Sequence, residues 1–379
     1  MKQFLISIFL LLSFPSIVFA QGKINTPKDE YYKAKVVNVN SEGEVISNGK
    51  TNLYQNLKLQ IEDGPNSGKS IDLHYGDPVT LTKDHELQKG DQIVLLKTTN
   101  PDGKVIYSVY DKYRFNKVIV AIVLFFILVI LIAGLKGVGS LVGLVTSLAV
   151  ILMFIVPNIL QGRDPLFISI VGSLIILFVS TYVAHGVSKQ TTVALVSTFF
   201  ALFITAILAT IATSATYLTG IGNEDIASLQ IGATSIINLK GLFLGGIIIG
   251  TLGALNDVTI TQAATIFEIA HVDKDIRYSS LVKRGFNVGK EHILSLVNTL
   301  VLAYAGSSLF IFIFIVLNPG NIPYWVILNT EMISGETIST IVGSAGLIMA
   351  VPISTLLAAW IVLNWKNKVA IKGNLTRKA

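Results

Sequence analysis

The chain has 379 residues, a mean hydropathy of +0.66 and 14% charged residues, whereas a typical soluble protein carries about 25%. This composition predicts a membrane protein and excludes an ordinary soluble globular one. The net charge of +6 does not indicate nucleic-acid binding, because no basic face with interleaved aromatic residues accompanies it.

The first twenty residues have the features of a secretory signal peptide. Lys2 precedes an apolar run from Phe4 to Leu12, and Val18 and Ala20 are spaced for signal cleavage. Because the apolar run is short for a membrane span, cleavage is favoured over an uncleaved anchor. The segment that follows is therefore expected to be exported, and the absence of cysteine is compatible with that location.

Residues 21–115 are predicted to form an exported β-rich domain. Leu57, Leu59 and Ile61 alternate with polar residues, and this period of two is typical of half-buried strands. Similar runs are separated by clusters of turn residues. About five short strands predict a small β-barrel, OB-like by strand count.

One turn, DGPNSGKS at residues 63–70, resembles a phosphate-binding loop but lacks its spacing. Three residues separate Gly64 from Gly68, one fewer than a phosphate loop requires. Strands are expected on both sides, whereas phosphate binding needs a helix N-terminus. A hairpin turn is therefore predicted. His74 and His85 have no further ligands at metal spacing, so no metal site is expected.

Seven hydrophobic runs long enough to cross a bilayer follow. With the β-rich domain outside, twelve Lys and Arg residues fall on the cytoplasmic side, as the positive-inside rule requires. The outer side holds only Arg163 and, at a helix start, Lys240, and its loops 218–237 and 319–337 carry the acids Glu224, Asp225, Glu331 and Glu336 without a base. A transmembrane helical domain is thus predicted over 116–365, with a basic cytoplasmic tail over 366–379. The predicted spans are 118–135, 138–157, 166–184, 192–217, 238–258, 292–318 and 339–364.

The helix predicted for the fifth span, 238–258, has glycines in its first part, which are followed by the acidic residues Asp257 and Glu268. The small-xxx-small pairs Gly241–Gly245 and Gly246–Gly250 predict close helix packing in lipid. Asp257 and Glu268 would lie roughly 16 Å apart on one helix, too far to share a proton or a metal ion. At 100° per residue, one stripe of a continuous helix contains Gly246, Gly250, Gly253, Asp257, Thr261, Ala264 and Glu268.

Two interpretations of Asp257 remain open. About 20 residues after Lys240 the helix reaches the cytoplasmic boundary, so Asp257 is expected near that interface. Together with Asn256, it either fixes the packing by hydrogen-bonding a neighbouring helix or lines a polar pathway. Glu268 is expected further out, on the cytoplasmic surface or facing a partner.

The sixth span carries polar residues into the hydrocarbon. Asn298 lies six residues past His292, and an amide at that depth needs a partner on another helix. Asn298 is interpreted as a packing contact, with a substrate ligand as the alternative, and Thr299 and Tyr304 follow it. In the last span, Pro352 predicts a kink.

Several stretches recur in a recognisable order: GPNSGK (64–69), DKYR (111–114), GTLGALND (250–257), RGFNVGKEHI (284–293), NTLVLAYAGSSL (298–309) and VGSAGLIMAVP (342–352). Together they resemble the YibE/F-like family of bacterial multi-pass membrane proteins. The resemblance implies a protein of the bacterial plasma membrane and implies no particular activity. The sequence departs from the family at Gln190, where lysine is usual, and at HILSLVN after Glu291. The resemblance marks as members of the pattern Asp257, Asn287, Gly289, Asn298, Thr299, Tyr304, Gly306, Ser307, Gly343, Gly346 and Pro352.

Two functions are compatible with these features. Polar residues converging in adjacent spans favour a transporter or transporter subunit for an unknown solute or ion. The alternative is a non-transporting envelope interaction or sensor protein whose extracytoplasmic β-domain binds a partner or ligand. No enzyme motif is present, so no catalytic residue or cofactor is expected. The expected partners are the lipid bilayer and, through the glycine faces, another membrane protein or a second copy.

Overall fold

The computed structural model describes residues 29–47, 50–76, 85–100, 102–222, 237–318 and 320–376, with side chains described outside 45–52 and 365–376. The predicted signal peptide and the loop acids Glu224 and Asp225 lie outside these residues. The chain forms two compact units that divide between Leu128 and Val129. Each unit is described by itself.

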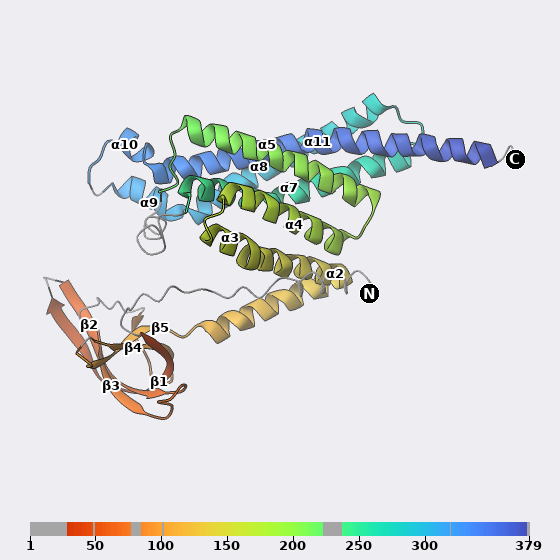
Figure 1. The fold of residues 1–379 in the computed structure, drawn as a ribbon. Helices are drawn as coiled ribbons and strands as arrows, with labels where there is room; N and C mark the ends of the chain where they lie inside the picture. Colours follow the sequence, from red (N-terminus) through yellow and green to blue (C-terminus); the bar gives the residue numbers. More distant parts are fainter. Residues whose placement is uncertain are drawn as a thin grey trace. The chain divides into compact units, whose positions relative to one another are not determined.

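The first unit contains one antiparallel sheet, curled and ordered β3-β2-β1-β4-β5 (Figure 1). The five predicted strands are confirmed, and β1 extends beyond the predicted 32–40. Its strands are β1 (Glu30–Ser47), β2 (Lys50–Ile61), β3 (Ser70–Tyr75), β4 (Gln92–Thr99) and β5 (Val105–Lys112).

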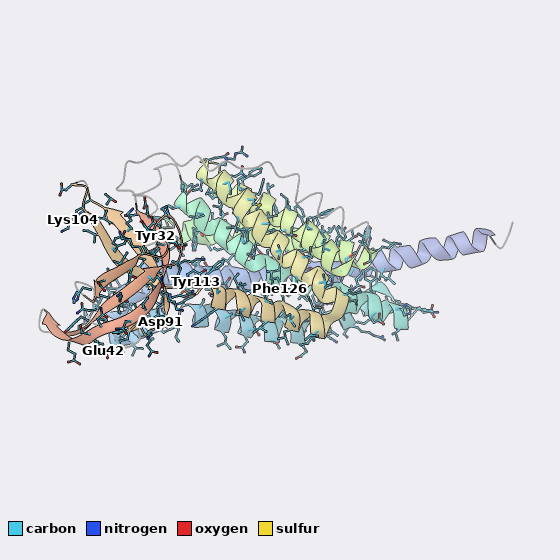
Figure 2. All side chains as sticks on the ribbon, turned by 90° about the horizontal axis from the view of Figure 1, so that it is seen from below. Tyr32, Glu42, Asp91, Lys104, Tyr113 and Phe126 are labelled. Carbon is cyan, nitrogen blue, oxygen red and sulfur yellow. The ribbon has the colours of Figure 1, made fainter. Side chains whose placement is uncertain are left out.

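Alternation along the strands builds the core of this sheet. Leu57 lies opposite Leu73 and Ala34 lies opposite Ile93, so apolar side chains from neighbouring strands meet on one face. Charged side chains such as Glu42 are exposed at the periphery (Figure 2). The stretch 62–69 joins β2 to β3 as the predicted hairpin turn, which contradicts any phosphate-loop interpretation.

The second unit is helical. Its elements, with α2 beginning in the first unit, are α2 (Phe115–Val150), the π-helix η2 (Ile151–Ile155), α3 (Val156–Leu160), α4 (Pro165–His185), α5 (Lys189–Ala215), α7 (Leu239–Val272), α8 (Tyr278–Ser307), α9 (Leu309–Leu317), α10 (Tyr324–Leu328) and α11 (Glu331–Thr376). Five described helices are long and apolar enough to span a membrane. The count is six if α8 and α9, bent by 63°, form one span.

The predicted count of seven spans therefore stays a prediction. The predicted spans 118–135 and 138–157 fall within one helical run, Phe115–Leu160. That run is interrupted at Gly134, whose φ of 58° and ψ of −142° are not helical. A positive φ of this kind is readily adopted by glycine, which lacks a Cβ.

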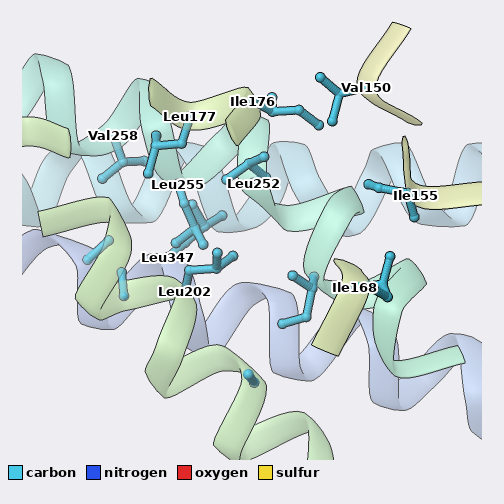
Figure 3. Close-up of a cluster of buried hydrophobic side chains, with 14 of the residues drawn as sticks. Val150, Ile155, Ile168, Ile176, Leu177, Leu202, Leu252, Leu255, Val258 and Leu347 are labelled. Carbon is cyan, nitrogen blue, oxygen red and sulfur yellow. The ribbon is translucent and has the colours of Figure 1, made fainter. Parts of the chain in front are cut away.

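The helices α4, α5, α7 and α11 pack around a shared apolar core. Leu177, Leu202, Leu255 and Leu347 are almost fully buried in it (Figure 3). Buried hydroxyls accompany these apolar residues, and Thr198 and Thr259 join α5 to α7 through a hydroxyl pair at 2.6 Å. Several other buried hydroxyls, such as those of Ser197, Thr205 and Thr251, donate to the carbonyl four residues earlier and are satisfied within their own helix.

One expectation about the last helix needs correction. Glu331 and Glu336, predicted in a loop, belong to the first turns of α11. Pro352 lies inside α11, and the kink predicted there stays a prediction. Proline is compatible with a membrane helix because hydroxyls and neighbouring helices satisfy freed backbone groups. The hydroxyls of Ser354 and Thr355 donate to the carbonyls of Ala350 and Val351, whereas the carbonyl that loses its helical donor at Pro352 is that of Ile348.

Candidate functional site

A cavity of 450 Å³ lies between α2, α4 and α7, and we call it the Asp257 cavity. Its walls mix apolar side chains with polar ones. Asp257 and Asn256 come from α7, and His185 comes from the last turn of α4. The remaining polar lining consists of Ser140, Ser147 and Ser180.

Asn256 and Asp257 have different environments although they are adjacent in sequence. The Thr181 hydroxyl donates to Asn256 Oδ1 at 3.0 Å, so Asn256 ties α7 to α4. Asp257 is exposed, and no described residue donates a hydrogen bond to its carboxylate. Asn256 therefore has the packing role, and Asp257 is free to face the cavity.

Close approach of α2 to α4 forms one wall of this cavity. A methyl group on Gly139 would lie 2.8 Å from the carbonyl oxygen of Val183, and one on Gly143 would lie 3.5 Å from Ser180. Gly139 and Gly143 are four residues apart, which places them on one helix face. Their spacing is the small-xxx-small signal that sequence analysis recognised in α7 but missed here.

A second cavity, of 430 Å³, lies between α8, α9 and α11, and we call it the Glu336 cavity. Its polar lining comprises Tyr304, Ser308, Glu336, Thr337 and Thr340. A neighbouring hollow of 310 Å³ shares Ser308 and Glu336 and adds Glu331. Carboxylates thus occur at both cavities.

Glu331 is bound within its own chain. Its carboxylate accepts backbone N–H bonds from Thr219, Gly220 and Ile221 at 2.7, 2.6 and 3.1 Å, and the Thr219 hydroxyl donates to it as well. Consecutive N–H groups that converge on one oxygen form an anion-binding nest. Glu331 therefore fixes this loop to the start of α11, whereas Glu336 is exposed and its carboxylate accepts no hydrogen bond from the described residues.

The Tyr304 side chain lies where α7 and α11 approach α8. Methyl groups on Gly250 and Gly343 would lie 3.7 and 3.8 Å from its hydroxyl oxygen. Tyr304 thus borders the Glu336 cavity and also lies beside Gly250 of α7 and Gly343 of α11.

The predicted packing glycines of α7 divide into two groups. A methyl on Gly245 would overlap Ser169, and one on Gly241 would approach Pro165 at 3.0 Å, so both pack against α4. A methyl on Gly246 or Gly253 would meet no described atom within 4 Å, so packing at these two glycines stays a prediction. Gly250 meets only Tyr304. The reason is that these three lie on the exposed stripe with Asp257.

The other predicted site residues lie apart from the cavities. Asn298 and Thr299 are exposed on α8, and neither lines a described cavity. Glu268 is exposed near the end of α7, and the Asp257 cavity does not include it. In the described ranges, no group of three His, Cys, Asp or Glu side chains could hold a metal ion.

Gln262 is a polar residue that sequence analysis missed. Its side chain is 2% exposed and donates to the Gly285 carbonyl at 2.9 Å and to the Thr355 hydroxyl at 2.8 Å. It therefore joins α7, α8 and α11. A methyl on Gly289 would lie 3.2 Å from the Gln262 amide, so the glycines of RGFNVGKEHI make room for this contact.

Apolar spans, buried hydroxyls and carboxylate-bearing cavities between helices define a multi-pass membrane protein. A family model described as YibE/F-like protein matches residues 121–364, which is 244 of the 379 residues. The chain belongs to the YibE/F-like family, and the resemblance in the sequence is confirmed. No curated protein and no solved structure matches it.

Proposed function

We propose that the chain is a transporter, or the membrane subunit of one, whose pathway follows the exposed stripe of α7. The observation that carries this proposal is that residues of this stripe lie beside both cavities. Gly250 borders Tyr304 of the Glu336 cavity, while Gly253 and Asp257 line the Asp257 cavity. Seven residues separate Gly250 from Asp257, which corresponds to about 10 Å along the helix.

The side chains along this route suit the passage of a polar solute. The glycines leave space beside the helix, and hydroxyls from Ser140, Ser147 and Ser180 face the carboxylate end. Asp257 has no hydrogen-bond donor among the described residues, so a solute or water would complete its hydration. Tyr304 stands between the cavities and would have to move during passage.

We also propose seven spans with the β-rich domain outside and the C-terminus in the cytoplasm. The interruption at Gly134 supports two spans within Phe115–Leu160, because 46 residues of helix would be about 69 Å long. A bilayer core is only about 30 Å thick. The twelve bases on the cytoplasmic side support the orientation.

Transport is tested in vesicles containing the purified chain. Uptake of Na⁺, K⁺, Mg²⁺ and a panel of labelled amino acids is compared for wild type, Asp257→Asn and the control Glu268→Gln. We expect at least a tenfold loss with Asp257→Asn and near wild-type uptake with Glu268→Gln, because only Asp257 lines the cavity. Uptake that survives Asp257→Asn contradicts the proposed route.

The second candidate function is an interaction or sensor role for the β-rich domain. It is favoured by Tyr31 and Tyr110, which are exposed and contact each other edge to face at a centroid distance of 5.2 Å. Exposed aromatic pairs are suited to partner binding, and closure of this sheet would give an OB-like barrel. Loss of a cellular phenotype on deleting 24–110, with the helical domain still inserted, supports this role. Full activity without these residues contradicts it.

A further inference from the structure

Helix α8 has one packed face and one open face. Gly285 and Gly289 are buried against side chains of α7 and α11. On the opposite face, Leu294 is 67% exposed and Val301 is 42% exposed. Asn287, Glu291 and Asn298 are exposed on that face as well.

The open face has the spacing of a helix–helix seam. Asn287, Glu291, Leu294, Asn298 and Val301 follow one another at intervals of four, three, four and three residues. Intervals that alternate between four and three residues place the side chains along one side of the helix, where they can contact a second helix. The five residues span two heptads, about 21 Å along the helix axis. We call these five residues the α8 seam.

Asn298 is the residue of the seam that most requires a partner. Its carboxamide is exposed in the apolar part of the helix and makes no hydrogen bond to any residue that the structure describes. Lipid offers no hydrogen bonds, so amides in membrane helices bond to neighbouring helices. The partner must therefore come from outside the described residues.

We propose that the α8 seam is the contact between two copies of this chain. Two copies inserted in the same direction bring their α8 helices together in parallel, with equal residues at equal depth. A carboxamide is both donor and acceptor, so Asn298 can pair with Asn298 of the second copy. In soluble parallel helix pairs an asparagine flanked by apolar seam residues specifies two-stranded pairing, and Asn298 lies between Leu294 and Val301 in the α8 seam.

The charges near the membrane boundary are complementary in the same arrangement. Lys290 and Glu291 are adjacent and both exposed. In a parallel helix pair, a residue at the a position of the heptad packs beside its own equivalent and beside the residue that precedes that equivalent, and the four–three spacing places Glu291 at an a position. Glu291 therefore faces Lys290 of the second copy, and Lys290 faces the second copy's Glu291. The contact would also cover the Glu336 cavity, because Val301 borders it. The proposed contact between two copies does not depend on whether the chain transports a solute.

The lack of native cysteine allows a direct test by crosslinking in native membranes. Leu294→Cys and Val301→Cys are oxidised, with Ala303→Cys as a control that is exposed on the same helix but about 140° from Asn298. We expect both seam variants to form disulfide-linked dimers of this chain and Ala303→Cys to form few. Crosslinking that is equal at all three positions, or absent at both seam positions, overturns the proposal.

A second measurement separates pairing by Asn298 from general aggregation. In nanodiscs or detergent, Asn298→Leu should weaken dimerisation about fivefold to thirtyfold, because interhelical amide bonds in lipid are lost. Asn298→Gln should retain most of it. Wild-type chain that stays monomeric over a concentration series, or crosslinks only to a different protein, contradicts a second copy as the occupant.

Discussion

At the scale of single residues, adjacent positions in α7 have separate roles. Asn256 is held by Thr181 and joins two helices, whereas Asp257 faces a cavity without a described hydrogen-bond donor. Asp257 could be singled out from the sequence, because the rotation of 100° per residue is enough to show which residues share one face of a helix. It did not locate Gln262, because one glutamine on a long helix looks the same whether it is exposed or buried.

The buried hydrogen bonds of Gln262 predict how a substitution of this residue changes stability. Gln262→Leu removes two buried hydrogen bonds and leaves the Gly285 carbonyl without that donor. We expect a loss of about 1 to 3 kcal/mol in the free energy of unfolding. Unfolding in mixed micelles measures it, and a double-mutant cycle with Thr355→Val should give a coupling energy because both residues share one bond. A change below about 0.3 kcal/mol would show that the three-helix contact is not a source of stability.

At the scale of elements, the strands were the easiest to predict. The run 92–99 coincides with β4, since alternating apolar residues bounded by turn residues leave little choice. Helix packing was harder. Both glycine pairs of α7 have the same spacing, and only the position of α4 determines that Gly241 and Gly245 are the packed pair.

Neighbouring glycines of α7 therefore form a matched pair for mutation. Gly245→Ala forces a methyl against Ser169, and we expect a destabilisation of about 1 to 3 kcal/mol from overpacking. Gly246→Ala meets open space and gains helix propensity, so stability should be unchanged or higher by up to about 1 kcal/mol. Thermal unfolding of the two variants under one condition compares them. Equal destabilisation would contradict the packing of α7 on α4.

At the scale of the whole molecule, the distribution of charged residues was enough to predict the orientation in the membrane. The cavities could not be predicted without the three-dimensional fold. The Glu336 cavity forms where the chain bends by 63° after Ser307 and α11 begins at Glu331. The sequence did not predict the bend, because the apolar run 292–318 has the length and composition of one straight span. Gly139 and Gly143 can be recognised as packing contacts only once the structure shows that α4 lies beside them.

Labelling of single cysteines in intact cells tests the orientation. Asp102→Cys in the turn before β5 should react with a membrane-impermeant thiol reagent from outside. Lys136→Cys and Lys283→Cys should react only after the membrane is opened, because both are assigned to the cytoplasmic side. Reaction at Lys283→Cys from outside would reverse the proposed topology.

A polar route along α7 requires that water reaches the exposed stripe of this helix between the two cavities. Cysteines at Gly250 and Gly253 are compared with Phe200→Cys, which is 46% exposed on α5 and expected to face lipid. A small charged thiol reagent reacts with thiolates, which form in water and not in hydrocarbon. We predict modification of both stripe positions at least tenfold faster than of Phe200→Cys. Equal, slow modification at all three positions would contradict a polar route along α7.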